Sequence, residues 1–264
     1  MWVLSFTISM GGCGKSLLLA CTAAQMAMDG YDVTVIDDAA DPQIGRMYGL
    51  SREDVENDLF SVVQKDLDIS TAIYETGIRN LKYIRSGIPL KEYLNINPIR
   101  FVEKISQVDT DYLFVDMRHP IGPAAILSLG ISHYYVLGPL RADNLRRAVD
   151  EAIDTLDQGV VLRAVPLGFV INQPQPPEKD ISDEFVQRLE SFFGLECLAV
   201  INYDEKLLSV FEKGILPIKE WPDSEFSKSI KAIAQRIEDE EGRPEPKKKD
   251  ILEFIRSRII FVRE

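Results

Sequence analysis

The stretch that decides the fold is Val3–Asp29, which reads VLSFTI-SMGGCGKS-LLLACTAAQMAMD. An apolar, β-rich run leads through a glycine-rich turn into a helical segment. Glycines let the backbone turn successive N–H groups inward, which makes a nest for phosphate oxygens at a helix N-terminus. In this pattern Lys15 reaches the β- and γ-phosphates of a nucleotide, and the Ser16 hydroxyl ligates Mg²⁺. Ser9 stands where the pattern usually has its first glycine, and an ordinary glycine-rich turn is the alternative interpretation.

Short β-rich runs alternate with helix-length segments along most of the chain. Strands that are separated by helices predict βαβ units, and therefore an α/β fold with a doubly wound, mainly parallel sheet. Gly30 is expected at the C-cap of the first helix, where a residue without Cβ can take a positive φ. The expected strands are Val3–Ile8, Tyr31–Ile36, Leu81–Ile84, Tyr112–Val115, His133–Leu137, Leu167–Ile171 and Leu198–Ile201. The expected helices are Ser16–Asp29, Leu145–Leu156 and Ile181–Phe193.

The composition narrows the classes of function. The 264 residues are 45% hydrophobic, which is enough for a substantial core. There are 30 basic and 42 acidic residues, and the net charge of −12 argues against nonspecific, charge-driven DNA binding. Three widely spaced cysteines and two histidines argue against a disulfide scaffold and a dedicated zinc site. No apolar run is long enough to span a bilayer, so we expect a cytoplasmic protein.

The composition changes once, near the C-terminus. An acidic cluster, Glu238–Glu241, precedes two prolines and a glycine and then three lysines, Lys247–Lys249. We therefore expect a main domain over residues 1–237, a charged hinge over 238–249 and a C-terminal appendix over 250–264. In that appendix an apolar helical face has basic residues at its borders. This pattern fits an amphipathic anchor on an anionic membrane or a partner, packing on the protein or a dimer mate, or disorder.

The sequence resembles the ParA/MinD family of P-loop ATPases over roughly residues 1–237. Met10–Ser16 aligns with the family's deviant Walker A motif, Lys-Gly-Gly-x-Gly-Lys-Thr/Ser. Val33–Asp37 and the later Asp41-Pro42-Gln43 resemble its second strand and first switch, with about two residues inserted. Tyr112–Asp116 resembles its Walker B strand, and Gly168–Asn172 resembles the strand that ends in a base-contacting asparagine. The resemblance implies the P-loop NTPase fold.

The resemblance also implies a site for ATP and Mg²⁺. Lys15, Asp41 and Asp116 are the candidate catalytic residues, with Asp41 orienting the attacking water. Ser16 and Asp116 would hold Mg²⁺, because Asp116 ends an apolar strand where an unpaired carboxylate would be costly to bury. The candidate nucleotide-binding residues are Gly11, Gly12, Cys13, Gly14, Lys15, Ser16, Leu17, Asn172 and Asn202.

Two points of this assignment depend on neighbouring residues. The insertion before Asp41 shifts its position in the chain, so Asp37 or Asp38 is the alternative for its role. Guanine-reading P-loop proteins typically have Asn-Lys-x-Asp, in which the aspartate carboxylate accepts hydrogen bonds from guanine. In this sequence Asn172 is followed by Gln173-Pro174-Gln175 instead. The absence of that carboxylate favours ATP over GTP.

One departure from the family pattern concerns hydrolysis. Met10 stands where the family has a lysine that crosses a dimer interface to the partner's phosphates. By analogy, a trans arginine finger contributes about 10³–10⁵ in rate, so we expect hydrolysis to be slow or dependent on a partner. Arg118, after the Walker B strand, is a candidate replacement for that lysine, and an exposed loop arginine is the alternative interpretation.

The resemblance therefore implies an ATP-binding, homodimeric switch ATPase that recruits a protein partner and thereby positions a cellular structure. Contact through residues 250–264 would bring the cytoplasmic protein to the inner face of the membrane. One alternative is a nucleotide-bound scaffold for polar localisation or for pilus or secretion assembly that scarcely hydrolyses ATP. The other is a metal-insertion or cluster-carrier ATPase, which would need a pair of cysteines across a dimer interface.

Overall fold

The computed structural model describes residues 1–8, 11–38, 43–51, 53–92, 96–116, 126–173, 175–176 and 181–242. This part of the chain forms one eight-stranded sheet with the order β3-β4-β2-β5-β1-β6-β7-β8. Paired strands are parallel, except that β3 is antiparallel to β4. The expected doubly wound, mainly parallel sheet is therefore confirmed. The strands are β1 Trp2–Thr7, β2 Val33–Asp37, β3 Tyr74–Glu75, β4 Leu81–Arg85, β5 Tyr112–Asp116, β6 Tyr134–Arg141, β7 Val165–Asn172 and β8 Cys197–Ile201.

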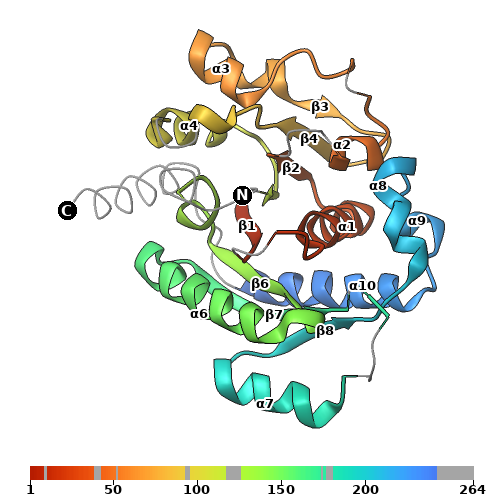
Figure 1. The fold of residues 1–264 in the computed structure, drawn as a ribbon. Coiled ribbons are helices and arrows are strands. Elements are labelled where there is room, and N and C mark those ends of the chain that lie inside the picture. The colour runs from red at the N-terminus through yellow and green to blue at the C-terminus, as the bar shows by residue number, and fades with distance from the viewer. Residues whose placement is uncertain are drawn as a thin grey trace.

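Helices cover both faces of this sheet (Figure 1). α1 and α10 pack on one face, and α3, α4 and α6 pack on the other. The helices are α1 Lys15–Met28, α2 Gln43–Met47, α3 Leu59–Lys65, α4 Pro98–Ile105, α6 Leu145–Leu162, α7 Asp183–Phe193, α8 Val210–Lys213, α9 Pro217–Glu220 and α10 Glu225–Glu238. A short 3-10 turn, Asp239–Gly242, ends the described part of the chain.

Side chains of the central strands alternate between the two helical layers. In β1, Leu4 and Phe6 belong to the core cluster under α1 and α10, whereas Val3 belongs to the cluster under α3 and α4. In β5, Phe114 and Val115 divide in the same way. Successive residues of a strand point to opposite faces, and both faces of a parallel sheet are covered. This explains why these strands are continuous apolar runs in the sequence.

Two helix ends differ slightly from expectation. α1 ends at Met28 with Asp29 as its C-cap, so Gly30 lies one position further and takes a φ of +113°. The N–H groups of Gly30 and Tyr31 donate to Ala27 and Met26, which is the hydrogen-bond pattern of a Schellman motif.

α6 continues past the expected end at Leu156 to Leu162. Gly159 is an interior residue of this helix and lets Tyr135 of β6 approach. A Cβ on Gly159 would lie only 2.5 Å from the Tyr135 hydroxyl. A glycine at position 159 therefore allows the C-terminal part of α6 to pack closely on β6.

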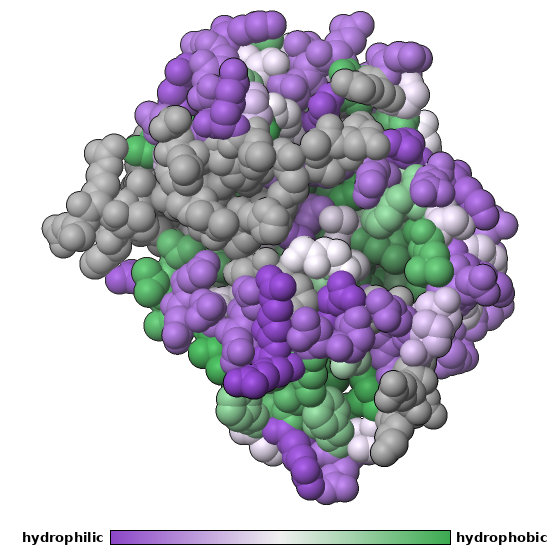
Figure 2. Space-filling model, viewed as in Figure 1, coloured by the Kyte–Doolittle hydropathy of each residue, from purple (hydrophilic) through white to green (hydrophobic). Residues whose placement is uncertain are grey.

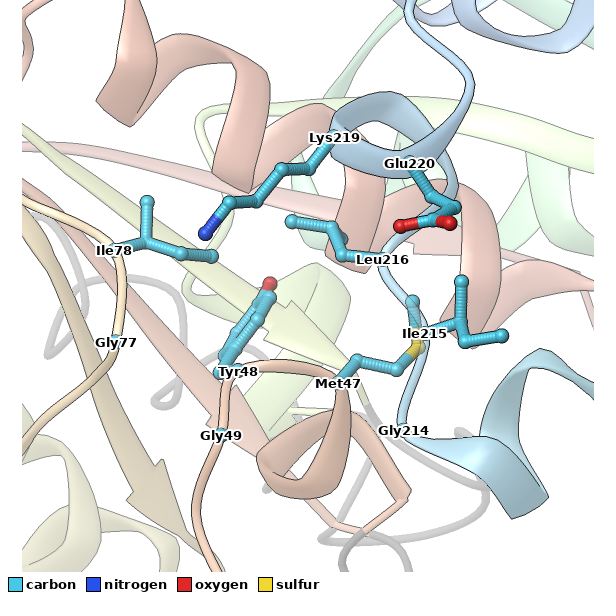
Figure 3. A pocket seen from close by; sticks show the side chains of 10 residues that line it. All are labelled: Met47, Tyr48, Gly49, Gly77, Ile78, Gly214, Ile215, Leu216, Lys219 and Glu220. Carbon is cyan, nitrogen blue, oxygen red and sulfur yellow. The ribbon is translucent and has the colours of Figure 1, made fainter.

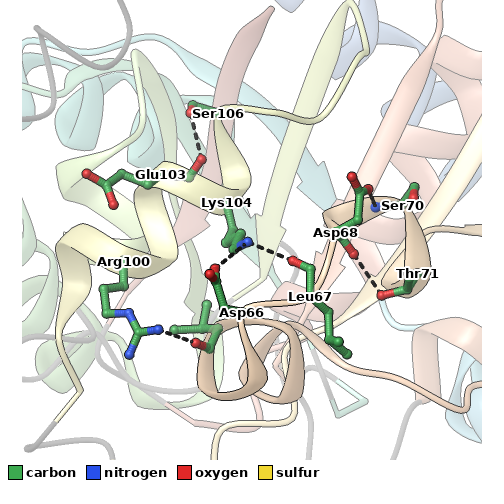
Figure 4. Close-up of polar contacts among 10 residues, drawn as sticks. Asp66, Leu67, Asp68, Ser70, Thr71, Arg100, Glu103, Lys104 and Ser106 are labelled. Carbon is green, nitrogen blue, oxygen red and sulfur yellow. Dashed lines mark hydrogen bonds and ion pairs between the residues drawn. The ribbon is translucent and has the colours of Figure 1, made fainter.

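Polar contacts tie α3 to α4 at one side of the fold (Figure 4). The Lys104 ammonium lies 2.9 Å from an Asp66 carboxylate oxygen and donates to the Leu67 carbonyl at 2.7 Å. Arg100 donates to the Val63 carbonyl at 2.8 Å, so two residues of α4 bind the C-terminal turn of α3. Basic side chains there satisfy carbonyls that a helix end leaves without intrahelical partners.

Most of the surface in Figure 2 is hydrophilic, with a hydrophobic area between α6 and α7. Leu156 of α6 and Phe185 of α7 are partly buried and pack against the same core cluster. Within the described ranges, no helix has the length and apolar character needed to cross a membrane. α10 ends at Glu238, and residues 243–264, which include most of the expected hinge and the whole expected appendix, lie outside the described residues, so the expected division into domain, hinge and appendix stays a prediction.

Candidate nucleotide site

The glycine-rich loop joins β1 to α1 at the centre of the sheet. Gly12 has a φ of +67° and Gly14 has a φ of +93°, in the region that side chains disfavour. Gly14 is the N-cap of α1, and its carbonyl accepts the hydrogen bond from Leu18 at 3.1 Å. The loop therefore opens directly into a helix N-terminus, where backbone N–H groups lack intrahelical partners and favour anions.

Asn172, at the end of β7, supports this loop from the side. Its amide nitrogen donates to the Cys13 carbonyl at 2.7 Å. A Cβ on Gly14 would lie 2.9 Å from the same nitrogen, so a side chain at Gly14 would displace Asn172. The structure brings the predicted residues Cys13, Gly14 and Asn172 together, although they come from segments far apart in the sequence.

Lys15 and Asp116 form a buried ion pair beside the loop. The Lys15 ammonium lies 3.6 Å from an Asp116 carboxylate oxygen, Oδ1, and the two side chains are only 10% and 5% exposed. The pairing of β1 with β5 explains this proximity, because the carboxyl ends of both parallel strands meet at the same edge of the sheet.

The chemistry of the two predicted metal ligands, Asp116 and Ser16, fits a bound Mg²⁺. Oδ1 of Asp116 is buried and accepts no hydrogen bond from the described residues. A buried carboxylate oxygen and the hydroxyl of Ser16, the residue after Lys15 in the chain, are donors of the kind that Mg²⁺ takes together with phosphate oxygens. The predicted metal ligands therefore have the right chemistry for the ion. Their metal binding remains a prediction.

Further buried carboxylates lie on the neighbouring strand. Asp37 is the register partner of Asp116 in the β2–β5 pair, and Asp38 follows it. Both are at most 1% exposed. The Tyr83 hydroxyl donates to Asp37 Oδ2 at 3.1 Å, and burial together with the Asp37 charge raises the pKa of Tyr83. Tyr83 therefore stays a hydrogen-bond donor to Asp37 at neutral pH.

A cavity of about 280 Å³ opens beside the loop and combines polar and apolar walls. Asn172 and Asn202 line it, and apolar side chains of α1, α8 and α10 form much of the rest. Such a mixture suits a flat, partly polar ligand such as a purine base. Its lining is Gly12, Gly14, Leu17, Leu18, Asn172, Gln173, Ile201, Asn202, Tyr203, Asp204, Leu207, Leu208, Phe211 and Phe226.

The cysteines lie apart from one another in sequence and are shielded from solvent. Cys13 and Cys21 are buried and Cys197 is partly buried. Burial raises the pKa of the Cys13 thiol, so this loop cysteine is a poor nucleophile and metal ligand at neutral pH. In the described part of the chain, no group of three or more His, Cys, Asp or Glu residues is arranged to hold a metal ion.

Several predicted residues cannot be compared with the structure. Met10, Asp41 and Arg118 lie outside the described residues, so the roles predicted for the switch aspartate and for the missing lysine stay predictions. Sequence reasoning missed Arg141, which ends β6 and lies 3.5 Å from the Gly12 carbonyl. Its sequence context offered no signal, because that contact arises only when β6 pairs with β1.

A second cavity of about 450 Å³ lies between α2, the segment before β4 and the segment that leads into α9 (Figure 3). Tyr48 and Leu216 form part of its wall, and the side chains of Lys219 and Glu220 come from α9. None of the predicted site residues lines it. Of these two cavities, the one beside the glycine loop is lined by predicted site residues, among them Asn172 and Asn202.

Comparisons with known proteins match most of the chain. Residues 4–218 match the family described as the CobQ/CobB/MinD/ParA nucleotide binding domain. An uncharacterized ATP-binding protein of Methanocaldococcus jannaschii is 26% identical over 244 residues, which are 90% of this chain and 89% of that protein.

Solved structures of MinD proteins share the fold. One is the septum site-determining protein MinD of Pyrococcus horikoshii complexed with Mg-ADP, with 20% identity and a TM-score of 0.75 over 91% of this chain and 97% of that one. Another is the MinC:MinD cell division protein complex of Aquifex aeolicus, with 18% identity and a TM-score of 0.71 over 94% and 98%.

Proposed function

Because the chain belongs to the CobQ/CobB/MinD/ParA nucleotide-binding family, we propose that it is an ATP-dependent dimeric switch ATPase. The observation that carries the proposal is the buried Lys15–Asp116 pair beside a glycine loop that opens into α1. ATP binds with its phosphates in the loop, and the bound nucleotide sets whether two copies of the chain associate. The dimer recruits a protein partner and so positions a cellular structure.

In this proposal each site residue has a distinct task. Lys15 leaves Asp116 to bind the β- and γ-phosphates, and the N–H groups of Gly11–Ser16 surround the phosphate oxygens. Ser16 and Asp116 hold Mg²⁺, which neutralises phosphate charge when it is bound. Asp41 orients the water that attacks the terminal phosphate, with Asp37 or Asp38 as the alternative.

The cavity beside the loop supports binding of the base. Asn172 and Asn202 supply amide groups for hydrogen bonds, and Leu17, Leu207 and Phe211 supply apolar walls. Binding of the base requires the Asn172 amide to serve both the Cys13 carbonyl and the base edge, since one NH₂ group carries two donors. We propose ATP in preference to GTP.

The similarity to MinD structures gives the proposal its partner class. One similar structure holds Mg-ADP and another is a complex of MinD with MinC, so one protein of this fold binds a nucleotide and another associates with a second protein. We propose a partner that docks on the ATP-bound dimer and stimulates slow hydrolysis. The basic and apolar residues of 250–264 would add a peripheral contact to an anionic membrane.

The experiment is the molar mass of the full chain by light scattering, with MgATP, with MgADP and without nucleotide. The proposal predicts the monomer mass of 29.8 kDa without nucleotide and twice that mass with MgATP. The Lys15→Ala variant should remain a monomer in all three conditions. A dimer that ignores nucleotide would favour the scaffold alternative, and a monomer throughout would contradict both.

A further inference from the structure

Arg141 reaches the phosphate loop from the strand next to β1. The last register pair between β1 and β6 is Thr7 with Leu137, and β6 continues to Arg141 beyond it. The extension carries Arg141 over the loop that follows β1. Its guanidinium nitrogen Nη1 lies 3.5 Å from the Gly12 carbonyl, and a Cβ on Gly12 would lie 3.8 Å from the same atom.

Asp143 fixes the orientation of that guanidinium. Nε of Arg141 donates to Oδ1 of Asp143 at 2.9 Å, and Nη2 donates to Oδ2 at 2.5 Å. This bidentate geometry holds the planar group in one orientation, with Nη1 directed to the loop. The hydrogen bonds from Arg141 also hold the pKa of the Asp143 carboxyl below its usual range, so the pair is fully charged at neutral pH.

A second donor acts on the next peptide of the loop. Asn172 is the register partner of Arg141 in the β6–β7 pair, and its amide donates to the Cys13 carbonyl. Adjacent residues of two neighbouring strands thus bind two consecutive carbonyls, those of Gly12 and Cys13. In a trans peptide the C=O and the following N–H point in opposite directions. Holding both carbonyls outward therefore turns the N–H groups of Cys13 and Gly14 toward the inside of the loop.

We propose that Arg141, held by Asp143, is a positioning residue of the phosphate loop that fixes the Gly12–Cys13 peptide so that the Cys13 N–H faces the nucleotide phosphates. The inference rests on the proposed nucleotide binding and names a determinant of it. Asp143 sets the orientation of Arg141 and, as its ion-pair partner, also offsets its charge. Arg141 therefore acts through geometry and not as a free cation that attracts phosphate.

Positioning and charge predict opposite effects of one substitution. Asp143→Asn removes the carboxylate that orients Arg141 and leaves the arginine charge uncompensated. If Arg141 acts through its position, MgADP affinity falls in this variant. If it acts through its charge, MgADP affinity rises, because the positive potential at the loop increases.

The experiment is calorimetric titration of the full chain with MgADP, at low and at high salt. Arg141→Met should lower the affinity about ten-fold, the loss typical of one hydrogen bond from a charged group. Arg141→Lys should lose nearly as much, because an ammonium keeps the charge but cannot make the bidentate pair with Asp143. Asp143→Asn should lower the MgADP affinity several-fold. The affinity losses of all three variants should persist at high salt.

Arg147→Met is the matched control. Arg147 is an exposed arginine on α6, paired with Glu151 at 3.5 Å, so its removal changes the net charge equally without touching the loop. It should leave MgADP affinity unchanged. The melting temperature of each variant without nucleotide separates a folding defect from an effect on the loop. If Arg141→Met is destabilised, Arg141→Lys replaces it as the variant in which MgADP affinity is compared with the wild type.

The outcomes separate this inference from the proposed function. Unchanged affinity in Arg141→Met, or tighter MgADP binding by Asp143→Asn, would overturn the positioning role while the wild type still binds nucleotide. If Arg141→Lys kept the full MgADP affinity, the positioning role would also be overturned, because charge alone would then explain the effect of Arg141. A wild type that binds no MgADP would instead overturn the proposed nucleotide binding itself.

Discussion

Replacing Gly87 with alanine should destabilise the fold more than an ordinary glycine substitution. Gly87 follows β4 with a φ of +68°, and it lies against Asp58, the residue that caps α3. A Cβ on Gly87 would lie 2.1 Å from Cγ and Oδ2 of Asp58 and 2.6 Å from its Cβ. The Asp58 carboxylate would have to move, and it would then lose its hydrogen bond from the Ser61 N–H at 2.7 Å.

The magnitude follows from two separate costs. An alanine in left-handed backbone costs about 1–2 kcal/mol. Loss of an N-cap side chain adds typically about 1 kcal/mol. Gly194 is a matched control, because its φ is +65° and nothing lies within 4 Å of its Cβ position. Gly194→Ala should therefore incur only the first cost.

Urea denaturation of the two variants measures the difference in the free energy of unfolding. We expect Gly87→Ala to lose about 1 kcal/mol more than Gly194→Ala. In an Asp58→Gly background the contact atoms are gone, so Gly87→Ala should then cost no more than Gly194→Ala. Equal losses for Gly87→Ala and Gly194→Ala in the otherwise native chain would refute the reasoning.

Three further predictions concern individual side chains. Tyr83→Phe should lower the free energy of unfolding by about 1.5–3 kcal/mol, since it removes a buried hydrogen bond to the Asp37 carboxylate. Chemical denaturation measures this loss, and an unchanged free energy of unfolding would contradict the prediction. Burial raises the pKa of Cys197 to about 11, so its thiol is protonated at neutral pH. The rate of its alkylation by iodoacetamide, followed by peptide mass spectrometry, should therefore keep rising up to about pH 11. A rate that levels off near pH 9 would contradict this prediction. Lys104→Met should let the pKa of Asp66 rise toward its ordinary value, because Lys104 lowers that pKa by a hydrogen bond and by its charge. Titration of the carboxyl group by NMR measures the shift, and an unchanged pKa would count against the contact.

The sheet could be predicted from the sequence because its central strands are buried on both faces. Val33–Asp37 and Tyr112–Asp116 are short apolar runs that no solvent-exposed element would contain. The small elements α2, α3, α4 and β3 were not predicted. Helices of five to eight residues and a two-residue strand carry little periodic pattern, and they are held by tertiary contacts such as those of Lys104.

The site shows the same division between local and long-range information. The glycine loop could be recognised because strand, loop and helix are contiguous in the chain. Asp116 could be anticipated from a charged residue at the end of an apolar strand, and the ion pair with Lys15 agrees with its position. Arg141 could not be anticipated, because it meets Gly12 across 129 positions of sequence through the pairing of β1 with β6.

Calorimetric titration of the wild type and of Lys15→Ala with MgATP and with MgGTP tests the central claim most directly. We expect the wild type to bind one MgATP per chain, to bind MgGTP more weakly, and to lose MgATP binding when Lys15 is replaced. Binding of neither nucleotide by a folded wild type would contradict the assignment of the loop. Equal binding of MgATP by Lys15→Ala would contradict the role given to Lys15.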